Sequence, residues 1–332
     1  MVRLQDVADA AGVSRSLASR ALNGVAHARV SETTRAHIVE VAERLAYIPD
    51  QRARALRTAR SGALALVVPD VSNAVFAELL TGVASVVREH QAAVLLSQIG
   101  DGQDLTAIVG RGRVDGVLLQ RPETMDDEHL YAVLRAEIPV VTFNSCLSER
   151  LGSVILADTE GAAAATEHLI DLGHRRIAFL GGRDLHDASR RRREGFLGCM
   201  SRHRLPVQPG HVVEGGWEAA DGQQAMTRLL QHPDRPTGVV VASVNAGLGA
   251  LAAAADLGLS VPSDLSVVAI QDTWFAAVAR PSLTVVQMPM REAGRAAAEM
   301  LYGAIVGDAL ENIVVTSRPP TLVQRASTDG IT

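Results

Sequence analysis

Short apolar segments recur along most of the chain, and longer stretches with a helical pattern separate them. Segments of this length that are rich in β-branched residues predict strands, and the stretches between them are long enough for crossover helices. Because strands that alternate with helices build parallel sheets, we predict an α/β fold here. The predicted strands are residues 63–68, 94–97, 117–119, 140–143, 177–180, 239–242 and 265–270.

These strands form two series, one before and one after Asp158, which indicates two similar lobes. In open parallel sheets a ligand binds at the carboxyl ends of the strands, so we expect a binding crevice between the lobes. Phe76 and Trp217 offer aromatic faces, and Arg192 offers forked donors, although a run of four arginines is more often a solvated face. The candidate ligand-binding residues are Asp70, Asn73, Phe76, Asn144, Arg192, Trp217, Ser243 and Gln271.

The first 48 residues have a different pattern, that of three short helices. Gly12 suits a tight turn between the first two helices, and Ser14 is placed to cap the second. Ser31 is a weaker candidate cap for the third. This spacing is typical of a helix-turn-helix domain that binds DNA. The expected helices span residues 5–11, 14–22 and 31–45.

The second of these helices has two chemically different faces. At about 100° per residue, one arc carries Arg15, Ser16, Ser19 and Arg20, and the opposite arc carries Leu17, Ala18, Ala21 and Leu22. In a recognition helix the polar face enters the major groove, where an arginine bonds both acceptors of a guanine. We expect base contacts from Arg15, Ser16 and Arg20, with Ser14 and Asn23 nearer the DNA backbone; a solvated amphipathic helix is the alternative.

A basic segment, residues 49–60, follows this domain and is too poor in apolar residues to be helical by itself. Ala53 and Leu56 share one helical face, and Arg52, Arg54 and Arg57 surround it with charge that attracts phosphate. We expect a hinge helix that forms on DNA and inserts Leu56 into a minor-groove step. A plain basic linker is the alternative.

Charge is distributed unevenly along the chain. Residues 1–60 hold ten arginines and six acidic residues, a net charge of +4, whereas the rest of the chain has a net charge of −9. A basic end on an acidic body is expected where only that end meets DNA phosphates. The chain begins without the pattern of a signal peptide and has no apolar stretch of membrane-spanning length, so we expect a cytoplasmic protein without a membrane partner.

Ten sequence motifs resemble, in the same order, those of the lactose and galactose repressor family. The resemblance covers nearly the whole chain and implies a helix-turn-helix domain joined to a two-lobed, periplasmic-binding-protein-like sensing domain with parallel sheets. The motifs are LQDVADAAGVS at 4–14, SRALNG at 19–24, RVSETTR at 29–35, LRT at 56–58, LVVPDVSN at 66–73, VDGV at 114–117, HLIDLGHRRIAF at 168–179, EGF at 194–196, LSVV at 265–268 and PSLT at 281–284.

The resemblance also implies where each domain lies and which residues act. Arg15, Ser16 and Arg20 correspond to the family's base-contacting residues, and Leu56 corresponds to its hinge leucine. The loop after the recognition helix, residues 25–28, is longer than is usual in the family, so the family's backbone contacts with DNA are not carried over to this loop. The implied domains are residues 1–48 for DNA binding, 49–60 for the hinge and 61–332 for sensing, with an N-lobe over 61–158 and 288–316 and a C-lobe over 159–283.

At three of the family's sugar-binding positions, the usual Asp, Asn and Asp are replaced by Asn144, Ser243 and Gln271. Carboxylates accept pairs of hydroxyl hydrogen bonds well, so their loss weakens the case for an ordinary hexose. The effector is then an unusual sugar, a derivative with an anionic group, or absent. Asp272 replaces one of the lost carboxylates only if the end of its strand shifts.

The implied function is that of a repressor that binds a pseudo-palindromic DNA operator as a homodimer under the control of a carbohydrate-like effector. A solute-binding receptor and a sugar-modifying enzyme are the alternatives. No GxSxG, HExxH, GxxxxGK[ST] or strand-following GxGxxG motif is present, so we expect no catalytic residues and no cofactor. Cys146 and Cys199 have no CxxC spacing, so no disulfide framework or metal site is predicted, and His174 is expected to be structural.

Overall fold

The computed structural model describes residues 2–22, 30–48, 60–100, 112–122, 138–146, 151–182 and 187–331. It divides into two compact units, residues 1–61 and residues 62–332. None of the helices in the described residues is both long and apolar enough to span a bilayer.

The first unit contains the three predicted helices, each within one residue of its expected ends. They pack around a small apolar core that includes Val7, Ala18, Ile38 and Val41. The apolar arc of the second helix faces this core, as the helical pattern predicts. The helices are α1 (Leu4–Ala10), α2 (Arg15–Leu22) and α3 (Glu32–Arg44).

The turn and the caps of this unit follow the expected chemistry. Gly12 has a φ of +66°, a left-handed conformation that a glycine adopts without strain. The Ser14 hydroxyl accepts a hydrogen bond from the Leu17 amide at 3.2 Å, and the Ser31 hydroxyl accepts one from the Thr34 amide at 3.2 Å. Both serines therefore cap their helices as predicted.

The second unit contains two six-stranded sheets among its described residues. The first has the order β11-β5-β4-β3-β1-β2, and all its described pairings are parallel. Its strands are β1 (Ala63–Val68), β2 (Ala93–Gln98), β3 (Gly116–Gln120), β4 (Val140–Phe143), β5 (Gly152–Ile155) and β11 (Asn312–Val314).

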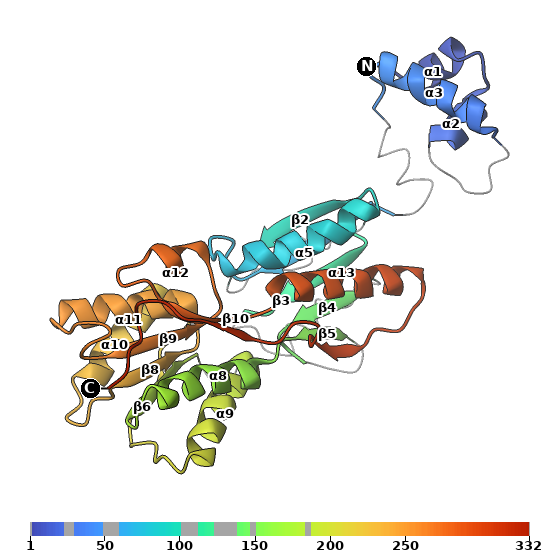
Figure 1. Cartoon of the computed structure of the whole chain (residues 1–332). Coiled ribbons are helices and arrows are strands. Elements are labelled where there is room, and N and C mark those ends of the chain that lie inside the picture. The colour runs from blue at the N-terminus through green and yellow to red at the C-terminus, as the bar shows by residue number, and fades with distance from the viewer. Residues whose placement is uncertain are drawn as a thin grey trace. The chain divides into compact units, whose positions relative to one another are not determined.

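Helices α5 (Val75–Glu89) and α13 (Met290–Val306) lie side by side against this first sheet (Figure 1). Their backbones approach closely at two glycines. A Cβ atom on Gly82 would collide with the backbone of Arg291, and one on Gly294 would collide with the Leu79 carbonyl oxygen. The two helices thus bring together segments that are about 200 residues apart in the sequence.

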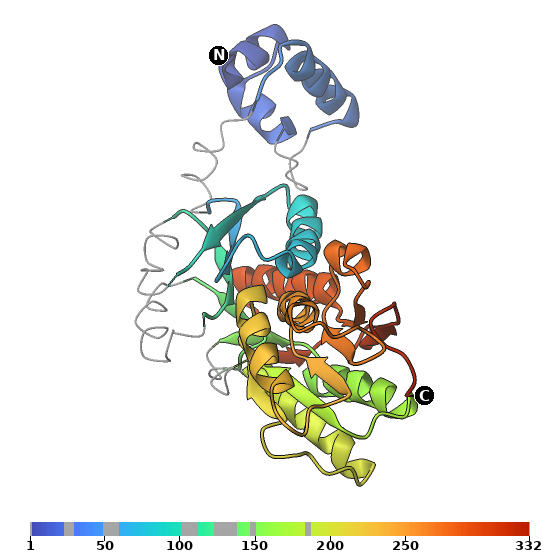
Figure 2. The same ribbon diagram turned by 90° about the vertical axis from the view of Figure 1, so that its left-hand side faces the viewer.

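The second sheet has the order β12-β10-β9-β8-β6-β7, and β12 is its one antiparallel member among the described pairings. Two helix pairs, α8 with α9 and α10 with α11, cover its faces (Figures 1 and 2). The elements are β6 (Ile177–Gly181), β7 (Val212–Glu214), β8 (Gly238–Val241), β9 (Ser266–Ile270), β10 (Thr284–Gln287), β12 (Thr321–Val323), α8 (Asp158–Asp171), α9 (Asp187–Arg202), α10 (Ala219–Leu230), α11 (Val244–Asp256) and α12 (Trp274–Val278).

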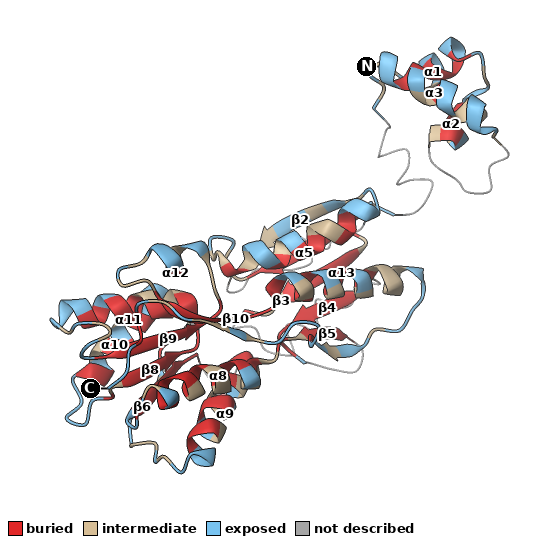
Figure 3. Ribbon diagram, in the orientation of Figure 1, coloured by how far each residue is buried: buried red, intermediate tan, exposed pale blue. Residues whose placement is uncertain are grey.

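The two sheets have the same strand plan, with β1 to β5 of the first matching β6 to β10 of the second. Strands β1, β6, β8 and β9 are buried along their whole length, which explains their continuous apolar runs (Figure 3). The predicted α/β fold with parallel sheets in two lobes is therefore confirmed. We call the part built on the first sheet the N-lobe and the part built on the second the C-lobe.

Candidate DNA-binding helix and inter-lobe junction

Helix α2 presents its predicted polar face to solvent. Ser14, Arg15, Ser16 and Arg20 are exposed, and Ser19 is half-buried. The Arg20 Nε donates a hydrogen bond to the Ser16 carbonyl oxygen, one turn back, at 3.3 Å. This contact directs the Arg20 guanidinium along the polar face of the helix.

Several residues predicted to bind DNA lie outside the described residues. These are Asn23 and the four hinge residues Arg52, Ala53, Leu56 and Arg57. Their roles remain predictions that rest on the sequence.

The candidate effector residues follow the carboxyl ends of strands in both lobes. Asn144 directly follows β4 and Gln271 directly follows β9, which are matching strands of the two sheets. Both residues have a positive φ, +57° and +75°, an uncommon conformation for residues other than glycine. The Asn144 backbone amide donates to the Val154 carbonyl oxygen, and the Gln271 backbone amide donates to the Val286 carbonyl oxygen. In each case the acceptor lies on the neighbouring strand.

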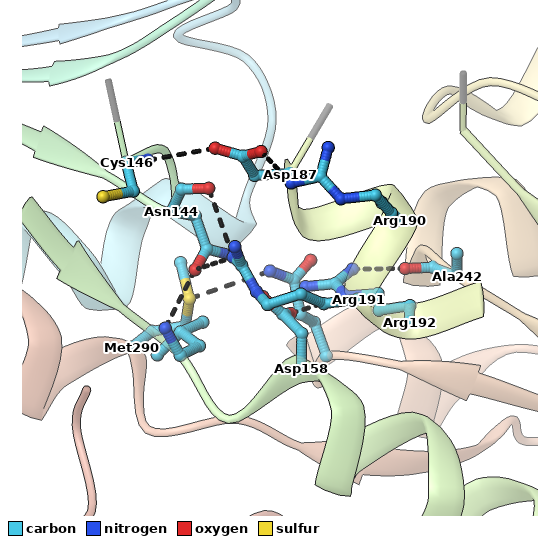
Figure 4. Close-up of polar contacts among 11 residues, drawn as sticks. Asn144, Cys146, Asp158, Asp187, Arg190, Arg191, Arg192, Ala242 and Met290 are labelled. Atoms are coloured by element: carbon cyan, nitrogen blue, oxygen red, sulfur yellow. Dashed lines mark hydrogen bonds and ion pairs between the residues drawn. The ribbon is translucent and has the colours of Figure 1, made fainter. Parts of the chain in front are cut away.

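Arg192 is buried, with 1% of its side chain exposed, so it is not part of a solvated charged face. Its Nε donates to Asp158 Oδ1 at 2.7 Å, and its Nη1 donates to the Ala242 carbonyl oxygen (Figure 4). Asp158 itself is fully buried in the first turn of α8, where the helix dipole favours a carboxylate. The N–H donors of the Arg192 guanidinium, which were predicted to bind a ligand, are thus largely bonded to groups inside the protein.

Arg191 uses the second oxygen of the same carboxylate. Its Nη2 donates to Asp158 Oδ2 at 2.9 Å and to both the backbone and side-chain oxygens of Asn144 at 3.2 Å (Figure 4). The Arg191 Nε is buried without a hydrogen-bond partner. Because Asn144 belongs to the N-lobe and Arg191 to the C-lobe, this guanidinium joins the two lobes.

Further polar contacts cross between the lobes. The Cys146 amide donates to Asp187 Oδ2 at 3.0 Å, and the Asn73 side-chain amide donates to Glu218 Oε1 at 3.3 Å. Glu218 also accepts a hydrogen bond from the Asn245 side chain at 3.2 Å. The carboxyl ends of the strands of both sheets therefore face one another.

Trp217 and Ser243 complete this region from the C-lobe. The Arg192 guanidinium lies over the Trp217 ring, 5.4 Å from its centroid, and the Ser243 hydroxyl donates to the Trp217 carbonyl oxygen at 2.8 Å. We call Asn144, Asp158, Arg191, Arg192, Trp217 and Ser243 the inter-lobe junction.

The contacts of the described residues do not connect the other candidate residues to the inter-lobe junction. The Asp70 carboxylate accepts hydrogen bonds from Ser72 in its own loop, and Phe76 packs against the apolar core. Gln271 donates weakly to the Met290 sulfur at 3.7 Å. Asp272 accepts from Arg325 at 2.7 Å, so one of its oxygens is already occupied by an ion pair.

Sequence reasoning missed the residues that organise the junction. Asp158 was identified only as a boundary between the two series of strands, and Arg191 and Glu218 were not singled out. The run of arginines was a usable signal, because a buried arginine requires a carboxylate and Asp158 lies between the two series of strands. No local pattern links positions 158 and 192.

His174 makes structural contacts. Its Nδ1 lies 3.0 Å from the Thr237 hydroxyl and its Nε2 lies 3.1 Å from the Asp329 carbonyl oxygen. Burial lowers the pKa of this imidazole. These contacts tie the turn before β6 to the C-terminal segment, as expected for a structural residue.

Comparison with known proteins agrees with both halves of this description. Residues 3–50 match the family described as bacterial regulatory proteins, lacI family, and residues 166–328 match a periplasmic binding protein-like domain. A probable HTH-type transcriptional repressor, ExuR of Bacillus subtilis, is 31% identical over 310 residues, covering 92% of each chain. The chain belongs to the LacI family.

Solved structures of this family extend the comparison. A LacI family transcriptional regulator from Mycobacterium smegmatis is 47% identical, with a TM-score of 0.77 over 81% of this chain and all of that one. A lac repressor dimer bound to operator and the anti-inducer ONPF is 27% identical, with a TM-score of 0.79 over 99% of both chains. A transcriptional regulator CelR–cellobiose complex is 28% identical, with a TM-score of 0.74 over 98% of this chain and all of that one.

Family membership decides between the functions considered from the sequence. The LacI match covers the helix-turn-helix region, which a solute-binding receptor does not require. The relatives of this chain are transcriptional regulators and not enzymes. The protein is a DNA-binding transcriptional regulator with an effector-binding domain.

Proposed function

We propose that the protein is a repressor that binds a pseudo-palindromic operator as a homodimer and is controlled by a small molecule bound between its lobes. The exposed donor face of α2 carries this proposal, because Arg15, Ser16 and Arg20 are available to DNA while the opposite face is buried. The operator-bound and ligand-bound structures of relatives support it. A cytoplasmic location, where the chromosome lies, follows from this role.

We propose a role for each part of the chain accordingly. Residues 1–48 would bind the operator half-site, and residues 49–60 would form a hinge in which Arg52, Ala53, Leu56 and Arg57 contact DNA. Residues 61–332 would sense the effector. The sequence predicts an N-lobe over 61–158 and 288–316 and a C-lobe over 159–283, but the second sheet also contains β10 and β12, and α8 begins at Asp158, so we extend the C-lobe to these residues. Ser14, Ser19 and Asn23 would support the base contacts.

The effector would occupy the inter-lobe junction and its surroundings, including Asp70, Asn73, Phe76 and Gln271. We propose a carbohydrate-like molecule with an anionic group, because Arg191 and Arg192 share a single carboxylate, that of Asp158. A ligand here would alter the contacts between the lobes and so shift the hinges of the dimer.

The exposed apolar edge of the N-lobe sheet supports dimerisation through this lobe. Strand β2 lies at this edge, and its Leu95 and Leu96 are 44% and 45% exposed. An exposed apolar edge strand favours a partner that covers it. Sedimentation that shows a monomer at every concentration would exclude a dimer that binds a symmetric operator.

Selection of bound sites from a random duplex pool tests the proposed function directly. With the full-length protein near physiological salt, we expect a two-fold symmetric site with a central CG step. The charge-matched variants Arg20→Ala, on α2, and Arg44→Ala, exposed at the end of α3, separate base contact from general basicity. Only Arg20→Ala should alter the selected sequence. Recovery of no preferred sequence, with or without small molecules from a cell extract, would contradict the proposal.

The effector class is tested by thermal denaturation in the presence of neutral hexoses, sugar acids and sugar phosphates. A ligand that binds the folded protein raises the melting temperature by mass action. We expect an anionic sugar to do so and Arg191→Met to abolish the shift. A shift caused by a neutral hexose alone would contradict the anionic assignment.

A further inference from the structure

Three side chains with metal-binding atoms gather between α8 and α9 of the C-lobe. The ligand atoms of Glu167, Cys199 and His203 all lie within 4.8 Å of one another. The Cys199 Sγ is 3.2 Å from Glu167 Oε2, and the His203 Nε2 is 2.6 Å from Glu167 Oε1. None of these residues takes part in the proposed DNA-binding surface or in the inter-lobe junction.

The spacing of two of these residues is that of a helical metal-binding pair. Cys199 and His203 are four positions apart, and the His203 amide donates to the Cys199 carbonyl oxygen at 3.2 Å, so helical geometry continues between them. Residues four apart lie on the same helical face, an arrangement that zinc proteins use for two ligands. Glu167 supplies the third group from α8, which packs beside α9.

Burial and charge also suit a divalent cation. Cys199 is fully buried, while the Glu167 and His203 side chains are 39% and 35% exposed, so the cluster is open to solvent on one side. A thiolate and a carboxylate would together neutralise two positive charges. The Arg202 guanidinium lies 3.7 Å from Glu167 Oε2, but its side chain is 60% exposed and has room to turn toward solvent.

We propose that Glu167, Cys199 and His203 bind one Zn²⁺ ion, with water as the fourth ligand. Sulfur, nitrogen and carboxylate oxygen are the ligands that zinc prefers, and three protein ligands with one open position are common at zinc sites. On binding, the Cys199 S–H bond breaks, the sulfur forms a bond to zinc, and the proton leaves to solvent. The oxidation state of every atom is unchanged.

The surroundings of Cys199 disfavour a redox role. Burial, together with the Glu167 carboxylate, raises the pKa of this thiol to about 12. Without a metal the sulfur is therefore a protonated thiol, which is a poor nucleophile. The exposed thiol of the chain is that of Cys146, whose backbone amide contacts Asp187 of the C-lobe.

A metal here would join the same two helices that the buried ion pair joins. Asp158 begins α8 and pairs with Arg192 on α9, and Glu167 and Cys199 meet further along the same two helices. Zinc would therefore add a second link within the C-lobe, and the melting temperature should rise with zinc concentration.

Cobalt(II) is the spectroscopic probe for this site, because a thiolate–cobalt bond gives a near-ultraviolet charge-transfer band and tetrahedral cobalt gives intense visible bands. Full-length, tag-free Cys146→Ser protein, stripped with a chelator, should show these bands at one cobalt per chain and lose them on addition of zinc. Adding Cys199→Ala should abolish the charge-transfer band. His203→Ala should weaken zinc binding more than about 100-fold, because even partners outside the ligand shell contribute up to that much.

His37→Ala is the matched control, since His37 is exposed on α3, outside the proposed site. It should leave zinc affinity and both cobalt bands unchanged. Circular dichroism establishes that each variant is folded, and His203, which is exposed and directly follows the last residue of α9, is the safer substitution. Absence of the cobalt bands from the Cys146→Ser protein, or their persistence in Cys199→Ala, would overturn the proposal.

Discussion

The arginines of α2 and those of α9 occupy opposite environments. Arg15 and Arg20 are exposed, whereas Arg192 is 1% and Arg191 is 19% exposed, and both of these pair with the buried Asp158. DNA arrives as a large polyanion, so an arginine that contacts it can remain in water until then. An arginine that borders a crevice must keep its charge inside the protein, which requires a fixed carboxylate.

The same difference in burial predicts how much each ion pair contributes to stability. When a buried pair is broken, the remaining charge has no water around it, so the loss of stability is larger than for an exposed pair. Three pairs in the sensing unit span the range from fully buried to exposed: Arg192–Asp158, Arg325–Asp272 and Arg291–Glu78. Both tryptophans, Trp217 and Trp274, lie in this unit, so their fluorescence follows its unfolding without interference from the DNA-binding unit.

The largest effect is expected for Asp158→Asn. This change keeps the side-chain volume but leaves two guanidinium groups, one of them fully buried, without their counter-charge. We expect the free energy of unfolding to fall by about 3–5 kcal/mol, measured by urea denaturation. A loss below about 1 kcal/mol would show that the pair is not needed to hold charge inside the C-lobe.

A smaller effect is expected for Asp272→Asn. Its pair with Arg325 is 2.7 Å long, and the two side chains are 17% and 15% exposed, so water partly compensates for the lost charge. We expect a loss of about 1–3 kcal/mol in the same urea experiment. A loss as large as that of Asp158→Asn would break the predicted dependence on burial.

Acidification should destabilise the C-lobe through two buried histidines. Burial lowers the pKa of both His168 and His174 in the folded protein. The unfolded chain therefore binds more protons as the pH falls below about 6.5, and stability that is present above this pH is lost as the pH falls through the folded-state pKa values.

Tryptophan fluorescence melts between about pH 7.5 and pH 5.5 measure this loss, in a window above the range in which most carboxylates titrate. His168→Gln with His174→Gln should flatten the pH dependence of the melting temperature. An unchanged slope in this double variant would assign the effect to other groups.

The smallest effect is expected at the surface. In the Arg291–Glu78 pair the side chains are 60% and 53% exposed, so water and salt screen the attraction. Glu78→Gln should lower the free energy of unfolding by no more than about 1 kcal/mol, and added salt should reduce the difference further. A larger loss would mean that this pair is needed to hold α5 against α13.

Local patterns predicted the elements that are stabilised locally. The three helices of the first unit begin and end within one residue of their expected positions, because Gly12, Ser14 and Ser31 have turn and capping preferences of their own. The strands β5, β7, β10, β11 and β12 were missed, since each has only three or four residues and no long apolar run.

The candidate sites were predicted only as far as single positions allow. Arg192 was identified, but its pairing with Asp158 joins residues that are 34 positions apart, so it follows from packing and not from spacing. The cluster of Glu167, Cys199 and His203 escaped notice for the same reason, because its third ligand comes from a neighbouring helix and no CxxC spacing is present. Long-range contacts of this kind are fixed by the tertiary fold.

Base contact by the exposed donors of α2 is measured by comparing the wild type with Arg20→Ala. Both are tested on the selected operator and on a set of operators with each base pair changed in turn. We predict that Arg20→Ala loses about 1–3 kcal/mol of discrimination at one base pair of each half-site and little elsewhere. Equal weakening on every sequence would contradict base contact by Arg20 and make this residue a phosphate contact.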